Sequence, residues 1–222
     1  MDDYTKAKEF WNGVFAEDAP EAVTGRAFAD ETFHRLTLKG LEGAHDVLDY
    51  GCGSGWGLFE LYYTRAFERG LGVDTSENGV RYANECAALS GLSDKLRFAQ
   101  GDVDMLGKEQ YDFILSVNLL DVIPESACET VLNALHRALR KGRSALICLN
   151  PEFTEDELIH LIGMEKRGEN YYKNGILRAR SLTTEQWRTL FSRSFAVDEV
   201  ARFALTEREQ AHPRVAYLLT KR

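Results

Sequence analysis

The sequence lacks the features that define several specialised classes of protein. It has 4 Cys in 222 residues and no Cys-x-x-Cys pair, which disfavours both a zinc site and a disulfide framework. No apolar run approaches the roughly 20 residues that a transmembrane helix needs. Residues 1–4 lack the basic and apolar regions of a signal peptide. We therefore expect a cytoplasmic protein with free thiols that does not enter a membrane.

Positive charge is also scarce. The chain has 27 Lys and Arg against 35 Asp and Glu, a net charge of -8, which disfavours a general nucleic-acid binder. The imbalance is uneven, because residues 1–139 carry 24 acidic and 12 basic side chains, whereas residues 140–222 carry 11 acidic and 15 basic ones. We expect no metal site, since the five histidines are scattered at His34, His45, His136, His160 and His212.

Short apolar runs that end in Gly, Asp or Asn recur through the middle of the chain. Such runs are typical of buried parallel strands, and they cover residues 47–50, 70–73, 96–99, 111–117 and 144–149. Helical patterns lie between them. The clearest has apolar residues at the i, i+3, i+4, i+7 and i+11 positions Cys128, Val131, Leu132, Leu135 and Leu139. Strands that alternate with helices predict a parallel sheet.

The end of the chain follows a different pattern. Thr183 and Gln186 have the spacing of a capping box and predict a helix start. Residues 195–205 and 214–220 then look like two strands with a short link, which must pair antiparallel. The sequence thus predicts an α/β fold with a doubly wound, mostly parallel seven-stranded sheet, an antiparallel C-terminal strand and helices on both faces.

We expect a single domain over residues 1–222, present as a monomer or homodimer. Its expected parts are an N-terminal helical lid at 1–45, a cofactor-binding core at 46–151, an inserted substrate lid at 152–181, and a closing helix and hairpin at 182–222.

A glycine-rich segment after the first expected strand is the most informative motif. It reads Asp49-Tyr50-Gly51-Cys52-Gly53-Ser54-Gly55-Trp56-Gly57. The dinucleotide fingerprint GxGxxG would need glycine where Trp56 stands. A carboxylate at Asp49 would repel a pyrophosphate and favour a ligand with an ammonium group. An alternative is that Asp49 only bonds nearby loop amides.

These residues resemble the class I S-adenosylmethionine-dependent methyltransferases, and the resemblance runs from about residue 47 to 149. It implies S-adenosylmethionine as cofactor. By this resemblance the methionine part is held by Asp49, Gly51, Cys52, Gly53, Gly55 and Trp56; the ribose by Asp74 and Thr75; the adenine by Asp102 and Val103; and the methyl-donor site is lined by Val117 and Asn118. Other interpretations remain open, since Asp74 suits a helix N-cap and Asp102 suits a plain turn.

The resemblance implies methyl transfer by direct displacement, which mainly requires alignment of acceptor and donor. We find no catalytic dyad, so the catalytic residues are unknown. Residues 118–121 read Asn-Leu-Leu-Asp and not the Asn-Pro-Pro-aromatic motif of amino-group methylases, which favours a small-molecule acceptor. Two alternatives are a non-catalytic sensor or partner subunit that binds S-adenosylmethionine, and a nicotinamide dehydrogenase. Trp56 counts against the dehydrogenase.

Residues of the two lid segments are candidates for the acceptor site. They are Tyr4, Trp11, Tyr171, Tyr172, Arg178 and Arg180. The aromatic residues of the first segment also suit ordinary core packing. We hypothesise that Arg178 or Arg180 binds an anionic group of the acceptor, because guanidinium groups match carboxylates and phosphates. The alternative is a solvated strand.

Overall fold

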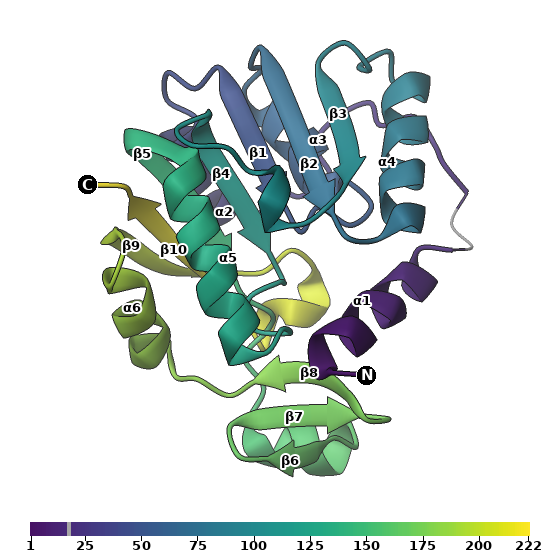
Figure 1. The fold of residues 1–222 in the computed structure, drawn as a ribbon, viewed down its shortest axis with the longest axis vertical. Helices are drawn as coiled ribbons and strands as arrows, with labels where there is room; N and C mark the ends of the chain where they lie inside the picture. Colours follow the sequence, from purple (N-terminus) through teal and green to yellow (C-terminus); the bar gives the residue numbers. More distant parts are fainter. Residues whose placement is uncertain (17–18) are drawn as a thin grey trace.

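The computed structural model describes residues 1–16 and 19–222. Its central feature is a seven-stranded sheet in the order β3-β2-β1-β4-β5-β10-β9 (Figure 1). The strands are β1 Asp46–Tyr50, β2 Arg69–Asp74, β3 Leu96–Gln100, β4 Tyr111–Val117, β5 Leu139–Cys148, β9 Ala196–Phe203 and β10 Arg214–Thr220. Only β10 runs antiparallel to its neighbours, β5 and β9. The predicted α/β fold is therefore confirmed.

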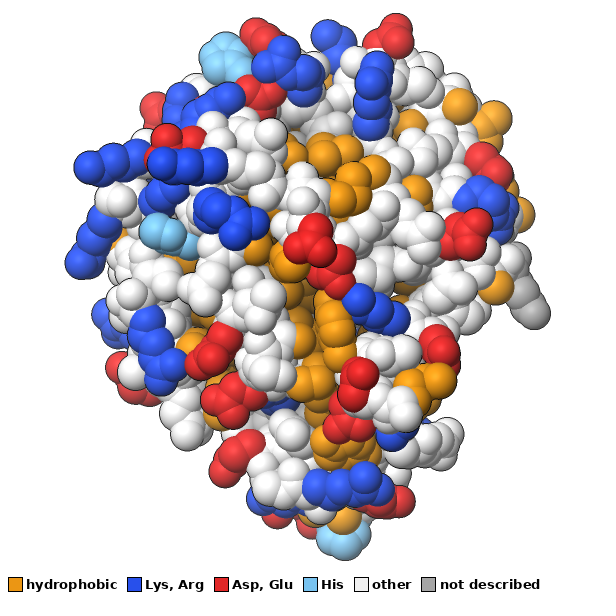
Figure 2. All heavy atoms as spheres, viewed as in Figure 1, with side chains coloured by type: hydrophobic (Ala, Val, Ile, Leu, Met, Phe, Trp, Pro, Cys, Tyr) orange, Lys and Arg blue, Asp and Glu red, His pale blue; other side chains and the backbone are white. Residues whose placement is uncertain are grey.

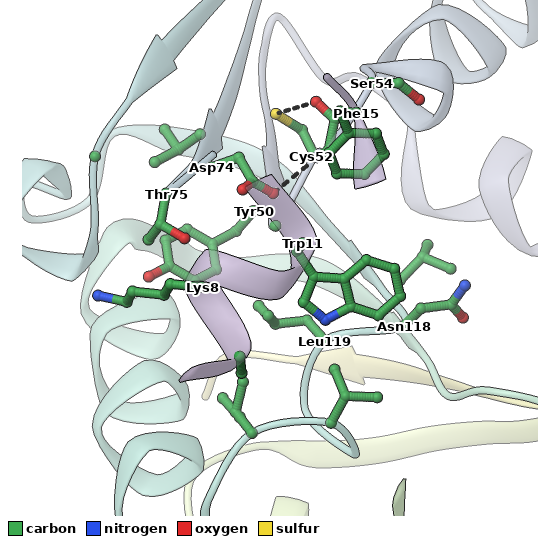
Figure 3. Close-up of a pocket in the computed structure, with 18 of the residues that line it drawn as sticks. Lys8, Trp11, Phe15, Tyr50, Cys52, Ser54, Asp74, Thr75, Asn118 and Leu119 are labelled. Atoms are coloured by element: carbon green, nitrogen blue, oxygen red, sulfur yellow. Dashed lines mark hydrogen bonds between the residues drawn. The ribbon is translucent and has the colours of Figure 1, made fainter. Parts of the chain in front are cut away.

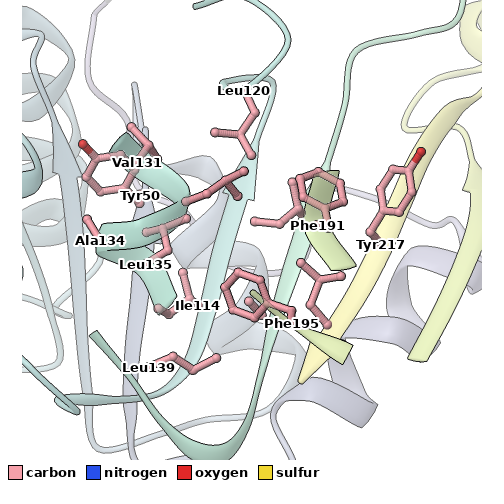
Figure 4. Close-up of a cluster of buried hydrophobic side chains, with 14 of the residues drawn as sticks. Tyr50, Ile114, Leu120, Val131, Ala134, Leu135, Leu139, Phe191, Phe195 and Tyr217 are labelled. Carbon is pink, nitrogen blue, oxygen red and sulfur yellow. The ribbon is translucent and has the colours of Figure 1, made fainter. Parts of the chain in front are cut away.

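Helices cover both faces of this sheet. The α-helices are α1 Asp3–Val14, α2 Glu31–Gly40, α3 Trp56–Thr64, α4 Glu77–Leu89, α5 Glu125–Ala138 and α6 Thr184–Ser192. Helices α2, α3 and α4 pack on one face, and α5 and α6 pack on the other. Alternate strand residues supply the two cores. Ile114 lies with the residues of α5 in one cluster (Figure 4), and Leu115 lies with those of α3 in the other. No α-helix of the described residues is long and apolar enough to span a membrane.

Local sequence signals explain where α5 and α6 begin and end. Helix α6 starts in a capping box, in which the Thr183 side chain accepts from the Gln186 backbone and the Gln186 side chain accepts in return. Helix α5 ends at Ala138, one residue earlier than predicted. Leu139 is instead the first residue of β5, because it pairs with Tyr111 of β4.

The segment at residues 152–181 folds into a small separate sheet. Its strands are β6 Glu165–Arg167, β7 Asn170–Lys173 and β8 Ile176–Arg180, preceded by the π-helical turn η2 Glu157–Leu161. Short 3-10 turns complete the fold: η1 Val103–Met105 and η3 Glu207–Gln210. Strand β8 contacts α1, which also contacts α4. In Figure 1, α1 and the small sheet lie beside one another beyond one end of the large sheet.

One buried carboxylate joins three strands at the opposite end of the large sheet. Asp112 of β4 accepts from the backbone amides of His45 and Asp46, at 3.0 and 3.1 Å. Arg140 of β5 lies 2.8 Å from the other oxygen of Asp112. Burial raises the pKa of Asp112, but the hydrogen bonds and charge of Arg140, together with the two amides, outweigh burial and hold that pKa below its usual value.

The Asp112→Asn variant is expected to destabilise the protein by about 1–3 kcal/mol near neutral pH, because buried amides lose a charged acceptor. Because the pKa of Asp112 in the folded protein is below the ordinary aspartate pKa of about 3.9, the stabilisation is complete at pH values above about 3.9. It is lost as the pH falls through the pKa of Asp112 in the folded protein. Urea unfolding should therefore show a difference between variant and wild type that shrinks on acidification. Asp94→Asn, at an exposed position, is the matched control. Equal unfolding midpoints for Asp112→Asn and wild type at neutral pH would contradict this role.

Candidate functional site

The turn between β1 and α3 is built from glycines in the left-handed region. Gly51, Gly53 and Gly55 have φ values of 77°, 49° and 84°. At Gly55 a Cβ atom would lie 2.7 Å from the Phe98 ring and 2.8 Å from Cβ of Ala83. Since side chains are excluded by both conformation and space, the backbone itself forms the floor of the site.

A carboxylate at the end of β2 holds this turn. The backbone N–H of Gly53 donates to Oδ2 of Asp74 at 2.8 Å, and the N–H of Ser76 donates to Oδ1 at 2.8 Å. Burial raises the pKa of Asp74, and the two amides oppose that effect. An ionised carboxylate has about four acceptor positions, so Asp74 keeps capacity for a ligand. Ser76 provides the N-cap side chain of α4, so the N-cap interpretation of Asp74 is wrong.

A cavity of about 260 Å³ lies above the turn, between it and α1 (Figure 3). The loop after β4 closes one side. The lining residues are Tyr4, Ala7, Lys8, Trp11, Phe15, Tyr50, Gly51, Cys52, Gly53, Ser54, Trp56, Val73, Asp74, Thr75, Gly101, Val117, Asn118, Leu119, Val122 and Ile123. This position, beyond the carboxyl ends of parallel strands, is where open α/β sheets bind ligands.

Helix α1 is fastened over the cavity by a network around Asp102. The Lys8 ammonium lies 2.6 Å from Oδ2 of Asp102, and the hydroxyls of Tyr4 and Tyr50 donate to the same carboxylate at 3.1 and 2.8 Å. Burial raises the pKa of Asp102, but Lys8 and the other donors outweigh it and hold the pKa below its usual value. Burial and the Asp102 charge raise the pKa of both tyrosines. The network holds the helix as a cover.

Many of the predicted site residues meet in this cavity. Those that line it are Gly51, Cys52, Gly53, Trp56, Asp74, Thr75, Val117, Asn118, Tyr4 and Trp11. Burial raises the pKa of the Cys52 thiol well above its usual value, so a thiolate is not available there. Asn118 has a φ of 58°, and its side-chain oxygen accepts from Arg214, which is paired with Glu209. These contacts fix the orientation of the Asn118 side chain.

Four other predicted cofactor residues lie outside the lining, namely Asp49, Gly55, Asp102 and Val103. Asp49 is buried below the turn, where the backbone of Leu58 donates to its carboxyl group. Burial, followed by the charge of Asp74, raises the pKa of Asp49 to about 8. The contact of Asp49 with a backbone amide therefore agrees with the alternative interpretation, in which this residue bonds nearby loop amides. The carboxylate of Asp102 is bonded by Tyr4 and Lys8 of α1, as described above.

The remaining acceptor candidates lie on the small sheet and do not line this cavity. Tyr171 is fully buried, and the Tyr172 hydroxyl donates to Asp3 of α1 at 2.8 Å. Arg178 and Arg180 line a second cavity of about 310 Å³. Arg178 also stacks on the ring of Trp11, with its guanidinium carbon 5.4 Å from the ring centroid. The two cavities are therefore neighbours.

Several lining residues were not predicted, and Ala7 and Lys8 are the most informative. Tyr4, Ala7, Lys8, Trp11 and Phe15 fall at i, i+3, i+4, i+7 and i+11, which is one face of a helix. This spacing is a signal in the sequence that could have identified the whole face. In the part of the chain that the structure describes, no group of three His, Cys, Asp or Glu could hold a metal ion.

Comparisons with known proteins identify relatives. A family model described as a methyltransferase domain matches residues 41–195. The protein-lysine N-methyltransferase EFM4 of Saccharomyces cerevisiae is 31% identical over 127 residues, which cover 52% of this chain and 55% of that protein. The sterol 24-C-methyltransferase ERG6B of Gibberella zeae is 30% identical over 118 residues, which cover 53% of this chain and 30% of that protein.

A solved structure matches over nearly its whole length. Geranyl diphosphate C-methyltransferase from Streptomyces coelicolor A3(2) has a TM-score of 0.67 at 12% identity, covering 100% of this chain and 98% of that chain. The present chain spans about half the length of EFM4 and about a third of ERG6B. The family model covers more than half of the present chain. The chain belongs to the methyltransferase-domain family, and it has the fold of a known methyltransferase.

Proposed function

We propose that this protein transfers the methyl group of S-adenosylmethionine to a small-molecule acceptor by direct displacement. The observation that carries the proposal is the cavity between the glycine turn, Asp74 and α1. It combines a backbone floor and a carboxylate with an apolar side formed by Trp11, Leu119 and Val122. When bound, the cofactor supplies a methyl group that is already activated on a sulfonium.

The residues present fit that cofactor, since the turn has no room for side chains and Asp74 has spare acceptor positions. We assign the ribose hydroxyls to Asp74, because a carboxylate can accept from two hydroxyls at once. The methionine part is assigned to the backbone of Gly51, Cys52 and Gly53. Two lining residues flank the acidic residues at the strand ends, since Thr75 follows Asp74 and Gly101 precedes Asp102. We assign the adenine to Thr75 and Gly101.

The acceptor must present an unprotonated nucleophilic atom. Among the ionisable side chains that line the cavity, Lys8, Tyr4 and Tyr50 bond Asp102, and burial keeps the Cys52 thiol protonated by raising its pKa. The spare acceptor positions of Asp74 are assigned to the ribose. Burial and Asp102 raise the pKa of both tyrosines, so neither accepts a proton near neutral pH. The contribution of the chain is therefore to align the reactants and exclude water.

Two observations support a small acceptor. Helix α1 covers the cavity, and Tyr172 and Arg178 of the small sheet contact the residues of α1 at Asp3, Phe10 and Trp11. The acceptor end is thus bounded by protein on more than one side. The similarity to a protein-lysine methyltransferase favours a second candidate, in which the acceptor is a lysine side chain. We expect a cytoplasmic location, as the free cysteines suggest.

The two acceptor classes are distinguished by the fate of a labelled methyl group. We expect tritium from methyl-labelled S-adenosylmethionine to enter acid-soluble molecules when the protein is incubated with a deproteinised cell extract. Label in acid-precipitated protein, from a dialysed extract, would favour the lysine candidate. Binding of S-adenosylhomocysteine with label in neither fraction would favour a non-catalytic binding protein.

The ribose assignment is tested by Asp74→Asn. We expect this variant to bind S-adenosylhomocysteine about ten- to a hundredfold more weakly in calorimetry, because a hydrogen bond to a charged acceptor contributes about 1.5–3 kcal/mol. The matched control is Asp104→Asn, an exposed aspartate near the same strand ends, which should bind as the wild type does. Unchanged affinity in Asp74→Asn would remove the basis of the assignment.

A further inference from the structure

The second cavity has no role in the function proposed above. It lies between the small sheet, the chain after β5 and the start of α6, with a volume of about 310 Å³. Ten of its sixteen lining residues are apolar and six are polar or charged, and polar and apolar surface contribute about equally. The lining residues are Asp121, Leu149, Asn150, Pro151, Glu152, Phe153, Leu158, Ile162, Met164, Arg178, Ala179, Arg180, Ser181, Leu182, Trp187 and Val215.

Arg180 is the unusual member of this lining. Its side chain is only 8% exposed, and its Nη1 atom has no hydrogen-bond partner in the structure. Among the described residues no carboxylate lies within ion-pair distance of its guanidinium. The guanidinium carbon lies 5.2 Å from the centroid of the Trp187 ring. A buried cation without an anionic partner is costly, and a bound anion is one partner that would satisfy it.

The carboxyl groups in the same cavity have other partners. Asp121 accepts from the backbone N–H and the side-chain amide of Asn150, at 2.9 and 3.1 Å. Glu152 accepts from Arg202 and from the hydroxyl of Thr184. The Cys128 thiol also interacts with Arg180, but burial raises its pKa to about 11, so it is neutral near neutral pH. Among the described residues none of these groups forms an ion pair with Arg180.

Arg178 brings a second guanidinium to the same place. Arg178 and Arg180 both lie on β8 and both line the second cavity, although the pairing of β8 with β7 is irregular and skips Arg178. Arg178 is half-buried, and its guanidinium carbon lies 4.4 Å from the Phe10 ring centroid, where aromatic rings and not carboxylates surround it. Through Phe10 and Trp11 it also borders the first cavity. Two cations thus line the same cavity beside the proposed methyl-donor site.

We propose that the second cavity binds an apolar molecule through an anionic group, a carboxylate or a phosphate, with Nη1 of Arg180 as the principal donor and Arg178 as the second. Guanidinium groups suit this role, because their forked donors match both anions and they lose less hydration than an ammonium. This inference rests on the proposed function in one respect, since it makes the bound anion the methyl acceptor. Binding itself is independent of catalysis.

Calorimetry with matched probes tests the site. We expect decanoate or decyl phosphate to bind, and decanol, of the same chain length, to bind at least about tenfold more weakly. The stronger of the two anions identifies the preferred group. Equal binding of decanol and both anions would overturn the proposal. S-Adenosylhomocysteine is titrated separately, so a failed cofactor site and a failed anion site give different results.

Variants then assign the donor. Arg180→Met should weaken binding of the anionic probe about ten- to a hundredfold and leave decanol binding unchanged. Arg180→Lys keeps the charge but not the forked donors, so its affinity for the anionic probe should lie between those of the wild type and Arg180→Met. Arg188→Met, at an exposed position on α6, is the matched control and should bind as the wild type does. Wild-type anion affinity in Arg180→Met would overturn the proposal. If Arg180→Met does not fold, two other variants test the proposal. Wild-type affinity for the anionic probe in either Arg180→Lys or Arg178→Met would then overturn it.

Discussion

The backbone turn between β1 and α3 is the constraint on which the rest of the site depends. Three glycines there adopt the left-handed region, and at Gly55 neither the conformation nor the neighbouring Phe98 ring leaves room for a side chain. The backbone N–H groups of Gly51 and Cys52 donate to the carbonyl of Val73 at the end of β2, and the N–H of Gly53 donates to Asp74 at 2.8 Å. These hydrogen bonds join the turn to β2. Everything that lines the first cavity is placed relative to this turn.

Three carboxyl groups near the ends of β1, β2 and β3 show how position changes the chemistry of one residue type. Asp49 lies under the turn, where burial raises its pKa to about 8. Asp74 faces the cavity, and burial raises its pKa against the effect of two backbone amides. Asp102 meets Lys8, and its pKa is lowered despite burial. Only Asp74 combines a place in the lining with spare acceptor positions, so the ligand-facing negative charge is concentrated at one point.

Features encoded by neighbouring residues could be predicted from the sequence, whereas features made by distant residues could not. The glycine turn, the capping box at Thr183 and the alternation of strands and helices are local patterns, and the structure has all three. The pairing of Lys8 with Asp102 joins residues 94 positions apart and leaves no local trace. The small sheet at residues 165–180 has strands of three to five residues with mixed polarity, which no periodicity reveals. Arg180 looks like a residue of a solvated strand until its burial is known.

Helix α1 lines the first cavity and contacts the small sheet, whose residues line the second cavity. On one side Lys8 and Tyr4 hold it to Asp102, and on the other Asp3 and Phe10 contact the small sheet through Tyr172 and Arg178. Most of these contacts are partly exposed, and each stabilises the helix position only modestly. The attachment of α1 to both the strand ends and the small sheet therefore depends on several modest contacts and not on one strong one.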